Sequence, residues 1–198
     1  MRIVLASQSP RRTALLDLVG IPHEVVPSRL EETAVQGEVP PDRVLRLARE
    51  KGDHVSSGIG EPALVIAADT LVVLENRILE KPADRKEAAE MLRSLSGRTH
   101  TVLTGVYLAR PSGATAEDIS ESRVRFHRLT EEEIGWYIAT GEPMDKAGAY
   151  AAQGRGAVFL RAIEGSFHNV VGFPLNLFYR MLPRIGLQMQ DLVASPPS

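Results

Sequence analysis

The sequence predicts an α/β fold in which a mixed sheet is flanked by helices, with two lobes and a central cleft. Residues 63–68 form a continuous apolar run, which is typical of a central strand buried on both faces. Strand-like and helix-like segments alternate over residues 2–56, which indicates β-α units. Two long strand-like segments, 99–109 and 120–129, are joined through a Pro-Ser-Gly turn and indicate a hairpin in the same sheet.

The first part of the chain begins with a strand and a helix joined by a short polar turn. Residues 2–6 predict a buried strand, and Ser9 and Pro10 suit the N-cap and first position of a helix that runs to Val19 and stops at Gly20. A strand is expected over 23–26, a polar loop over 28–39 and an amphipathic helix over 41–56. The apolar run then continues as a strand through residues 69 and 70 to residue 74.

The second part contains two helix starts with capping-box spacing. Asp84 with Glu87, and Thr130 with Glu133, predict helices over 84–95 and 130–139. A glycine-rich polar stretch covers 141–156, followed by expected strands over 157–163 and 170–171 and a helix over 174–182. Residues 1–185 are expected to form a single domain with two lobes, and residues 186–198 a flexible tail.

The composition narrows the possible classes of protein. With 198 residues, 43% hydrophobic and 24% charged, the chain matches an ordinary globular domain. The net charge of −2 argues against a general binder of nucleic acid polymers. Cysteine is absent, which excludes disulfides and thiolate metal sites. No apolar run approaches the ~20 residues of a membrane span, and no signal-peptide pattern precedes the first strand, so we expect a cytoplasmic protein without membrane contact.

The expected start of the first helix has the features of a phosphate site. Ser7 and Ser9 supply hydroxyls, and Arg11 and Arg12 supply planar guanidiniums beside free backbone N–H groups. Two arginines oppose the positive end of the helix dipole, so a purely structural role is unattractive. The alternative is that both are simply solvated. The segment therefore predicts a phosphorylated ligand.

Asp69 is the strongest catalytic candidate. It follows the buried apolar run at the edge where open α/β sheets place their chemistry. A carboxylate there is costly unless it is paired, bound to a metal or used in a reaction. The alternative is a structural carboxylate that caps a turn or pairs with a nearby lysine.

Two further segments suit a nucleotide. The glycines of 141–156 permit close approach of a ligand, and Gln153 offers both a donor and an acceptor to a base edge. Glu31 and Glu32 form an acidic loop pair that is ordinarily just solvated but could hold Mg²⁺ beside phosphates. The five histidines are far apart and show no metal-binding spacing.

Over residues 1–182 the chain resembles the Maf family of nucleoside triphosphate pyrophosphatases. The resemblance rests on separated motifs in the same order: ASQSPRR (6–12), LAREK (47–51), AADT (67–70), KP (81–82), LSGRTH (95–100), EPMDKAGAY (142–150), QG (153–154), EGS (164–166) and NVVGFPL (169–175).

The resemblance implies an elongated fold like that of the inosine triphosphate pyrophosphatases. It implies hydrolysis of a nucleoside triphosphate to the monophosphate and pyrophosphate with a divalent cation, Mg²⁺ or Mn²⁺. Residues 69–70 and 145–148, together with Gln153, look like the branch that acts on dTTP and UTP. The family also implies a homodimer, and its members are described as inhibitors of septum formation.

Site residues are implied position by position. Asp69 matches the proton acceptor, and Glu32 matches a polar position that lines the cleft. We expect Glu32 and Asp69 to hold the metal. Arg11, Thr70 and Gln153 match the specificity positions. The residues that match phosphate- and substrate-binding positions are Ser7, Arg12, Lys51, Lys81 and Lys146; among these, Lys51 and Lys81 rest on the resemblance alone.

Two rival functions stay open. One is a pyrophosphatase for another nucleotide such as 7-methyl-GTP, which a comparison of substrates would separate. The other is a non-catalytic nucleotide sensor acting on cell division, which would bind nucleotide without turnover.

Overall fold

The computed structural model describes residues 1–33 and 35–193, which divide into two compact units. Unit 1 comprises Met1–Asp69, Thr104–Ser120 and the described residues from Gly172 onward. Unit 2 comprises Thr70–Leu103 and Glu121–Val171. Both units therefore draw on strands that are far apart in the sequence.

The strands form one seven-stranded sheet in the order β2-β1-β3-β5-β6-β7, with β4 paired to β3. β1 is parallel to β2 and β3, whereas β3 with β4 and β6 with β7 are antiparallel, which confirms the predicted mixed sheet. The strand bounds are β1 Ile3–Ala6, β2 Glu24–Val25, β3 Leu64–Leu74, β4 Arg77–Leu79, β5 Thr99–Ala109, β6 Thr115–Phe126 and β7 Leu160–Glu164.

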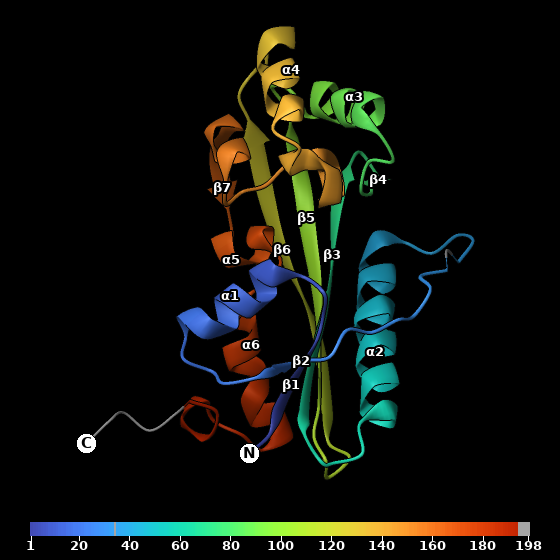
Figure 1. Cartoon of the computed structure of the whole chain (residues 1–198), viewed down its shortest axis with the longest axis vertical. Coiled ribbons are helices and arrows are strands. Elements are labelled where there is room, and N and C mark those ends of the chain that lie inside the picture. The colour runs from blue at the N-terminus through green and yellow to red at the C-terminus, as the bar shows by residue number, and fades with distance from the viewer. Residues whose placement is uncertain (34, 194–198) are drawn as a thin grey trace. The chain divides into compact units, whose positions relative to one another are not determined.

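In unit 1, helices cover both faces of the sheet. Figure 1 shows α2 (Pro40–Gly58) on one side of β1, and α1 (Pro10–Leu18) and α6 (Leu175–Met181) on the other. The apolar side chains of α2 pack with those of β1 and β3 in a buried cluster. Because β3 is covered on both faces, its first six residues are all buried, as the apolar run predicts.

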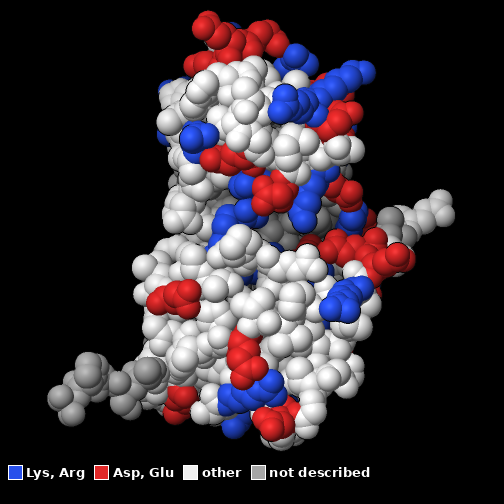
Figure 2. All heavy atoms as spheres, viewed as in Figure 1, with Lys and Arg blue, Asp and Glu red and all other residues white. Residues whose placement is uncertain are grey.

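Unit 2 contains α3 (Arg85–Leu95) packed against α4 (Glu131–Ala139). Both helices begin with a side-chain cap: Asp84 accepts from the Glu87 N–H, and Thr130 and Glu133 form a complete capping box. Figure 2 shows acidic side chains gathered over the region of α4, in keeping with three glutamates in its first turn, where the helix dipole favours negative charge.

Three predicted elements differ in the structure. β6 begins at Thr115 and ends at Phe126, so it lies earlier than the expected 120–129. The strand expected over 157–163 begins only at Leu160, because residues Arg155–Phe159 form the 3-10 helix η3 before β7. The expected strand at 170–171 is instead the end of α5 (Phe167–Val171). The Asn169 amide donates to the Val102 carbonyl and to Ser122 Oγ, and these buried bonds hold a turn of helix where two valines locally favour a strand.

The segment after α6 is packed as far as it is described. Two 3-10 helices, η4 (Leu182–Ile185) and η5 (Met189–Asp191), follow α6, and Leu187 and Leu192 are buried. Residues 194–198 of the expected flexible tail lie outside the described residues. Among the described residues, no helix has the length and apolar character needed to cross a membrane.

Candidate active site

The turn between β1 and α1 is tied together by Ser7 and Arg12. Ser7 is buried, and its Oγ accepts hydrogen bonds from the Ser9 N–H (3.1 Å) and from Arg12 Nη1 (3.1 Å). Arg12 Nε also donates to the Gly172 carbonyl at 2.9 Å. Ser9 occupies the N-cap position, but its hydroxyl makes no capping bond. Ser7 therefore takes the organising role that the sequence assigned to Ser9.

The Arg12 guanidinium lies within the electrostatic reach of two carboxylates. Burial lowers its pKa from the ordinary value, Asp69 and Glu32 act in the opposite direction, and neighbouring Arg11 lowers it further. Arginine nevertheless stays charged, because its ordinary pKa lies far above neutral pH. The start of α1 thus presents a half-buried positive charge whose neighbours include acidic groups. That this charge binds phosphate stays a prediction.

Lys51 joins two of the predicted site residues. Its Nζ lies 2.6 Å from Asp69 Oδ1 and 2.6 Å from Glu32 Oε1. α2 supplies the lysine and β3 the aspartate, while Glu32 comes from the loop that precedes α2. The structure therefore brings together Ser7, Arg12, Glu32, Lys51 and Asp69 within unit 1.

The two Asp69 oxygens have different surroundings. Oδ1 binds Lys51, so the structural alternative of a lysine-paired carboxylate is partly realised. Oδ2 is buried and has no hydrogen-bond partner among the described residues. A buried acceptor left without a partner is unfavourable, so this oxygen is suited to meet a proton or a cation brought by a ligand.

A divalent cation fits the donor set at this position in part. Glu32 and Asp69 supply hard carboxylate oxygens, and Oδ2 is available. Among the described residues, no group of three or more acidic or histidine side chains could hold a metal by itself. A cation at this pair would need further ligands, which phosphate oxygens and water ordinarily supply to Mg²⁺.

Of the other predicted residues, Arg11 lies in the first turn of α1 in unit 1, and the rest belong to unit 2. Thr70 follows Asp69 directly in β3. Lys81 is exposed just after β4, and the adjacent Glu80 carbonyl accepts from the Gly148 N–H at 3.1 Å. The Lys146 ammonium donates to Asp145 Oδ1 (2.5 Å) and to the Glu142 carbonyl (2.8 Å). The Lys81 and Lys146 segments are thus neighbours.

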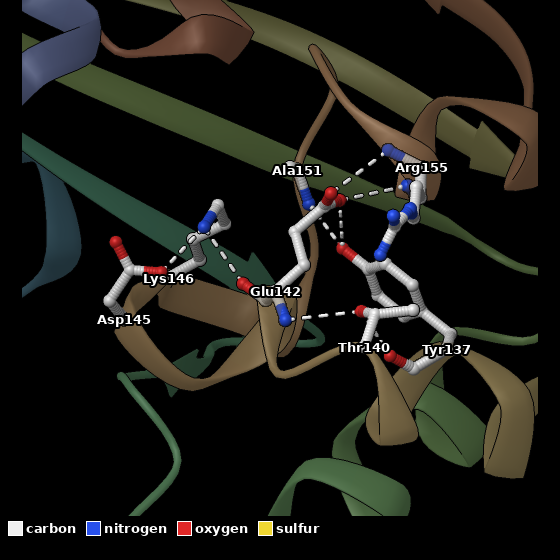
Figure 3. A network of polar contacts seen from close by, with 8 residues as sticks. Tyr137, Thr140, Glu142, Asp145, Lys146, Ala151 and Arg155 are labelled. Atoms are coloured by element: carbon white, nitrogen blue, oxygen red, sulfur yellow. Dashed lines mark hydrogen bonds and ion pairs between the residues drawn. The ribbon is translucent and has the colours of Figure 1, made fainter.

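Gln153 is exposed on a loop whose anchor the sequence reasoning missed. Figure 3 shows the carboxylate of Glu142 facing the backbone of this loop and the hydroxyl of Tyr137. Glu142 appeared in a family motif but received no role. The available signal was weak: a charged residue next to a glycine-rich stretch is ordinarily solvated.

The comparisons with known proteins decide the family. The family model described as "Maf: Maf-like protein" matches residues 2–185. The chain belongs to the Maf-like protein family. A relative from Anaeromyxobacter sp. (strain Fw109-5) named "dTTP/UTP pyrophosphatase" is 49% identical to this Maf-like chain, covering 93% of the chain and 90% of the relative. Relatives with the same name from Moorella thermoacetica and Bacillus anthracis (strain CDC 684 / NRRL 3495) are 47% and 43% identical; each comparison covers 95% of this chain and 97% of the relative.

A solved structure supports the predicted fold of the Maf-like chain. The Staphylococcus aureus Ham1 protein matches with a TM-score of 0.53 at 15% identity, over 92% of this chain and 98% of that one. At this identity the likeness concerns the fold alone.

Proposed function

We propose that this Maf-like chain is a hydrolase that converts dTTP and UTP to the monophosphate and pyrophosphate. The observation that carries the proposal is Asp69: it is buried, fixed through one oxygen by Lys51, and left with its other oxygen unpartnered. Such a carboxylate is suited to take a proton from water. The name dTTP/UTP pyrophosphatase, carried by relatives at 43–49% identity, supports the substrate class.

In the proposed reaction, cationic groups bind the phosphates before water attacks. Arg11 and Arg12 supply guanidiniums at the N-terminus of α1, whose N–H groups also favour an anion. Ser7 holds the Arg12 side chain in place. Lys51 lies at the Asp69 carboxylate and provides a further positive charge. Charge stabilisation by groups that are already in position accounts for most of the rate in phosphoryl transfer.

Asp69 Oδ2 would accept one proton from the attacking water. The water oxygen forms a bond to the α-phosphorus, while the bond from that phosphorus to the α,β-bridging oxygen breaks. The electron pair leaves with pyrophosphate, and the proton stays on Asp69 until solvent removes it. Because Lys51 holds Oδ1, the carboxylate is fixed with Oδ2 free for this transfer.

A divalent cation, Mg²⁺ or Mn²⁺, is part of the proposal. Glu32 and Asp69 would hold it, and when bound it would offset the charge of the triphosphate. Activity should then disappear on exhaustive chelation with EDTA and return when Mg²⁺ or Mn²⁺ is added. Full activity after chelation would contradict the proposed requirement for a divalent cation.

The base preference is assigned to two residues of unit 2 and one residue of unit 1. We propose that Thr70 and Gln153 favour pyrimidines together with Arg11, and that Lys81 and Lys146 bind the substrate. Gln153 can match the alternating acceptors and donor of a uracil or thymine edge. The predicted cytoplasmic location and homodimer, and the absence of membrane and nucleic acid partners, remain predictions.

The products distinguish this proposal from other phosphatase reactions. We expect dTTP to yield dTMP and pyrophosphate, with no dTDP or inorganic phosphate as first products. In water labelled with heavy oxygen, attack at the α-phosphorus puts the label into dTMP, whereas attack at the β-phosphorus puts it into pyrophosphate. Release of dTDP, or label in pyrophosphate, would contradict the mechanism. Nucleotide binding without turnover would favour the sensor alternative.

A further inference from the structure

The loop that carries Gln153 is anchored on both sides by one pair of side chains. Ahead of Gln153, the Ala151 N–H donates to the Tyr137 hydroxyl at 3.0 Å. Beyond it, the Arg155 N–H donates to Glu142 Oε2 and the Gly156 N–H to Glu142 Oε1, each at 3.0 Å. The two anchors are themselves joined, because the Tyr137 hydroxyl donates to Glu142 Oε1 at 2.8 Å (Figure 3).

The loop also lies against the Glu142 carboxylate. A Cβ atom at Gly154 would lie 2.8 Å from Oε2 and 2.9 Å from Oε1, closer than a side chain permits. Gly154 has φ +148, a conformation that favours glycine. The backbone around Gln153 therefore follows the position of this carboxylate.

The surroundings of Glu142 favour its charged form. Burial raises the pKa of the carboxyl, but the Arg155 and Gly156 N–H groups, the Tyr137 hydroxyl and the Lys146 charge together bring that pKa below its ordinary value. Hydrogen bonds to a charged acceptor are stronger than those between neutral groups. The carboxylate can therefore hold several backbone donors of the loop at once.

The backbone of Glu142 also contacts Lys146, a proposed substrate-binding residue of the same region. Its carbonyl oxygen accepts from Lys146 Nζ at 2.8 Å, and Lys146 belongs to the proposed site. Tyr137 is fixed in turn, because its ring is buried and packs edge-on against Phe159 at a centroid distance of 5.1 Å. Tyr137 therefore ties the Gln153 loop to the buried face of α4.

We propose that Glu142, supported by Tyr137, is a positioning residue that sets the pyrimidine preference of the enzyme by holding the Gln153 loop. This inference rests on the proposed function, because it assigns Gln153 to the base. Neither side chain takes part in the bond-breaking step. Loss of the anchor should therefore affect the choice between bases more than the turnover of bound dTTP.

Three variants separate positioning from folding. Glu142→Ala removes both anchors beyond Gln153 and the acceptor of the Tyr137 hydroxyl, and leaves the bond from the Ala151 N–H to Tyr137. Glu142→Gln retains one carbonyl oxygen for Tyr137 and Gly156, but places an amide NH₂ against the Arg155 N–H, so its effect should be intermediate. Tyr137→Phe retains the ring against Phe159 and removes only the hydroxyl. Glu131→Gln is the control: its carboxylate, on the helix that carries Tyr137, forms an exposed ion pair with Arg93.

The first readout is the ratio of kcat/KM for dTTP to that for GTP. We expect Glu142→Ala to lower this ratio by about ten- to a hundredfold, because displacement of a positioning group by about 1 Å has effects of this size. The loss for dTTP should appear mainly in KM. Tyr137→Phe and Glu142→Gln should show smaller losses, and Glu131→Gln none. A purely structural role would lower the rates for both nucleotides by a common factor and leave the ratio unchanged.

The second readout does not require activity. Amide hydrogen exchange of residues 151–156 in the free protein, measured well below the melting temperature, should be faster in Glu142→Ala and unchanged in Glu131→Gln. Unchanged exchange, or faster exchange with an unchanged base ratio, would overturn the inference while leaving the proposed function intact. A wild-type protein with no preference for dTTP would instead overturn the proposed function, and the exchange measurement would still decide whether Glu142 anchors the loop.

Discussion

At the residue scale, the account depends on the division of labour between the two oxygens of Asp69. Asp69→Asn keeps the shape and the contact to Lys51 but removes the proton acceptor. We expect kcat for dTTP to fall by roughly 10²–10⁴-fold, the usual contribution of a positioned acid–base group. The control is Asp118→Asn, which removes an exposed carboxylate paired with Arg184 in the same unit. Near-normal kcat in folded Asp69→Asn would disprove its role as the base.

The two arginines of α1 provide a second test at this scale. Arg11→Ala and Arg12→Ala should each reduce kcat/KM by an amount equivalent to about 1.5–3 kcal/mol, the usual value of a charged hydrogen bond. Arg161→Ala, which removes an exposed arginine on β7, should have little effect. Arg12 also holds Ser7 and Gly172, so its variant should lose thermal stability as well. Equal and small kinetic effects in all three variants would contradict phosphate binding at the start of α1.

At the element scale, the sequence predicted best those helices and strands that a single local pattern determines. The apolar run predicted the buried part of β3, and the spacing of Thr130 and Glu133 predicted the start of α4. The end of α5 could not be predicted, because Asn169 stabilises it through Val102, which is distant in the sequence. The Glu142 anchor was missed for the same reason, since its partners are backbone groups with no residue-type signature.

Two glycines should respond to an added methyl group in opposite ways, because Gly105 of β5 packs closely on α2 and Gly135 of α4 has open space beside it. A Cβ at Gly105 would lie 2.5 Å from the Val44 carbonyl oxygen, so Gly105→Ala should destabilise the fold by about 1–3 kcal/mol. At Gly135, within α4, no described atom other than those of its chain neighbours and the surrounding helix backbone lies within 4 Å of an added Cβ. Gly135→Ala should therefore stabilise by about 0.5–1 kcal/mol. Urea denaturation of both variants checks the sign, and a neutral Gly105→Ala would contradict the close approach.

At the scale of the whole molecule, buried His100 should make stability depend on pH. It contacts the Tyr150 hydroxyl within an aromatic cluster, and burial lowers its pKa to about 4. The unfolded chain, with a pKa near 6.5, binds the proton more readily. This group's contribution is therefore complete above about pH 6.5 and should decrease by about 3 kcal/mol as the pH falls to 4.

Urea midpoints between pH 7 and pH 4.5 measure this effect. His100→Gln keeps a polar partner for Tyr150 but does not titrate, so its stability should vary less with pH than that of the wild type. The exposed His127 is the control, and His127→Gln should retain the full dependence. Parallel curves for the wild type and His100→Gln would refute this explanation.

For the candidate site in unit 1, the sequence predicted which residues follow the strands, but it did not predict which side chains contact one another. The phosphate-site and catalytic predictions for Arg12 and Asp69 came from their places after strands. Lys51 carried no signal of its own, because a lysine on a helix is ordinarily solvated. The fold alone brings it to within 2.6 Å of both Glu32 and Asp69.

The most direct test of the central claim is a nucleotide panel assayed for released pyrophosphate. It compares kcat/KM for dTTP, UTP, GTP, ATP and 7-methyl-GTP with the same enzyme preparation and added Mg²⁺. We predict values for dTTP and UTP well above those for the purine nucleotides, because a site that pairs polar base edges rejects a base that leaves them unpaired. A purine triphosphate as the best substrate, or no turnover with any of the five, would contradict the account.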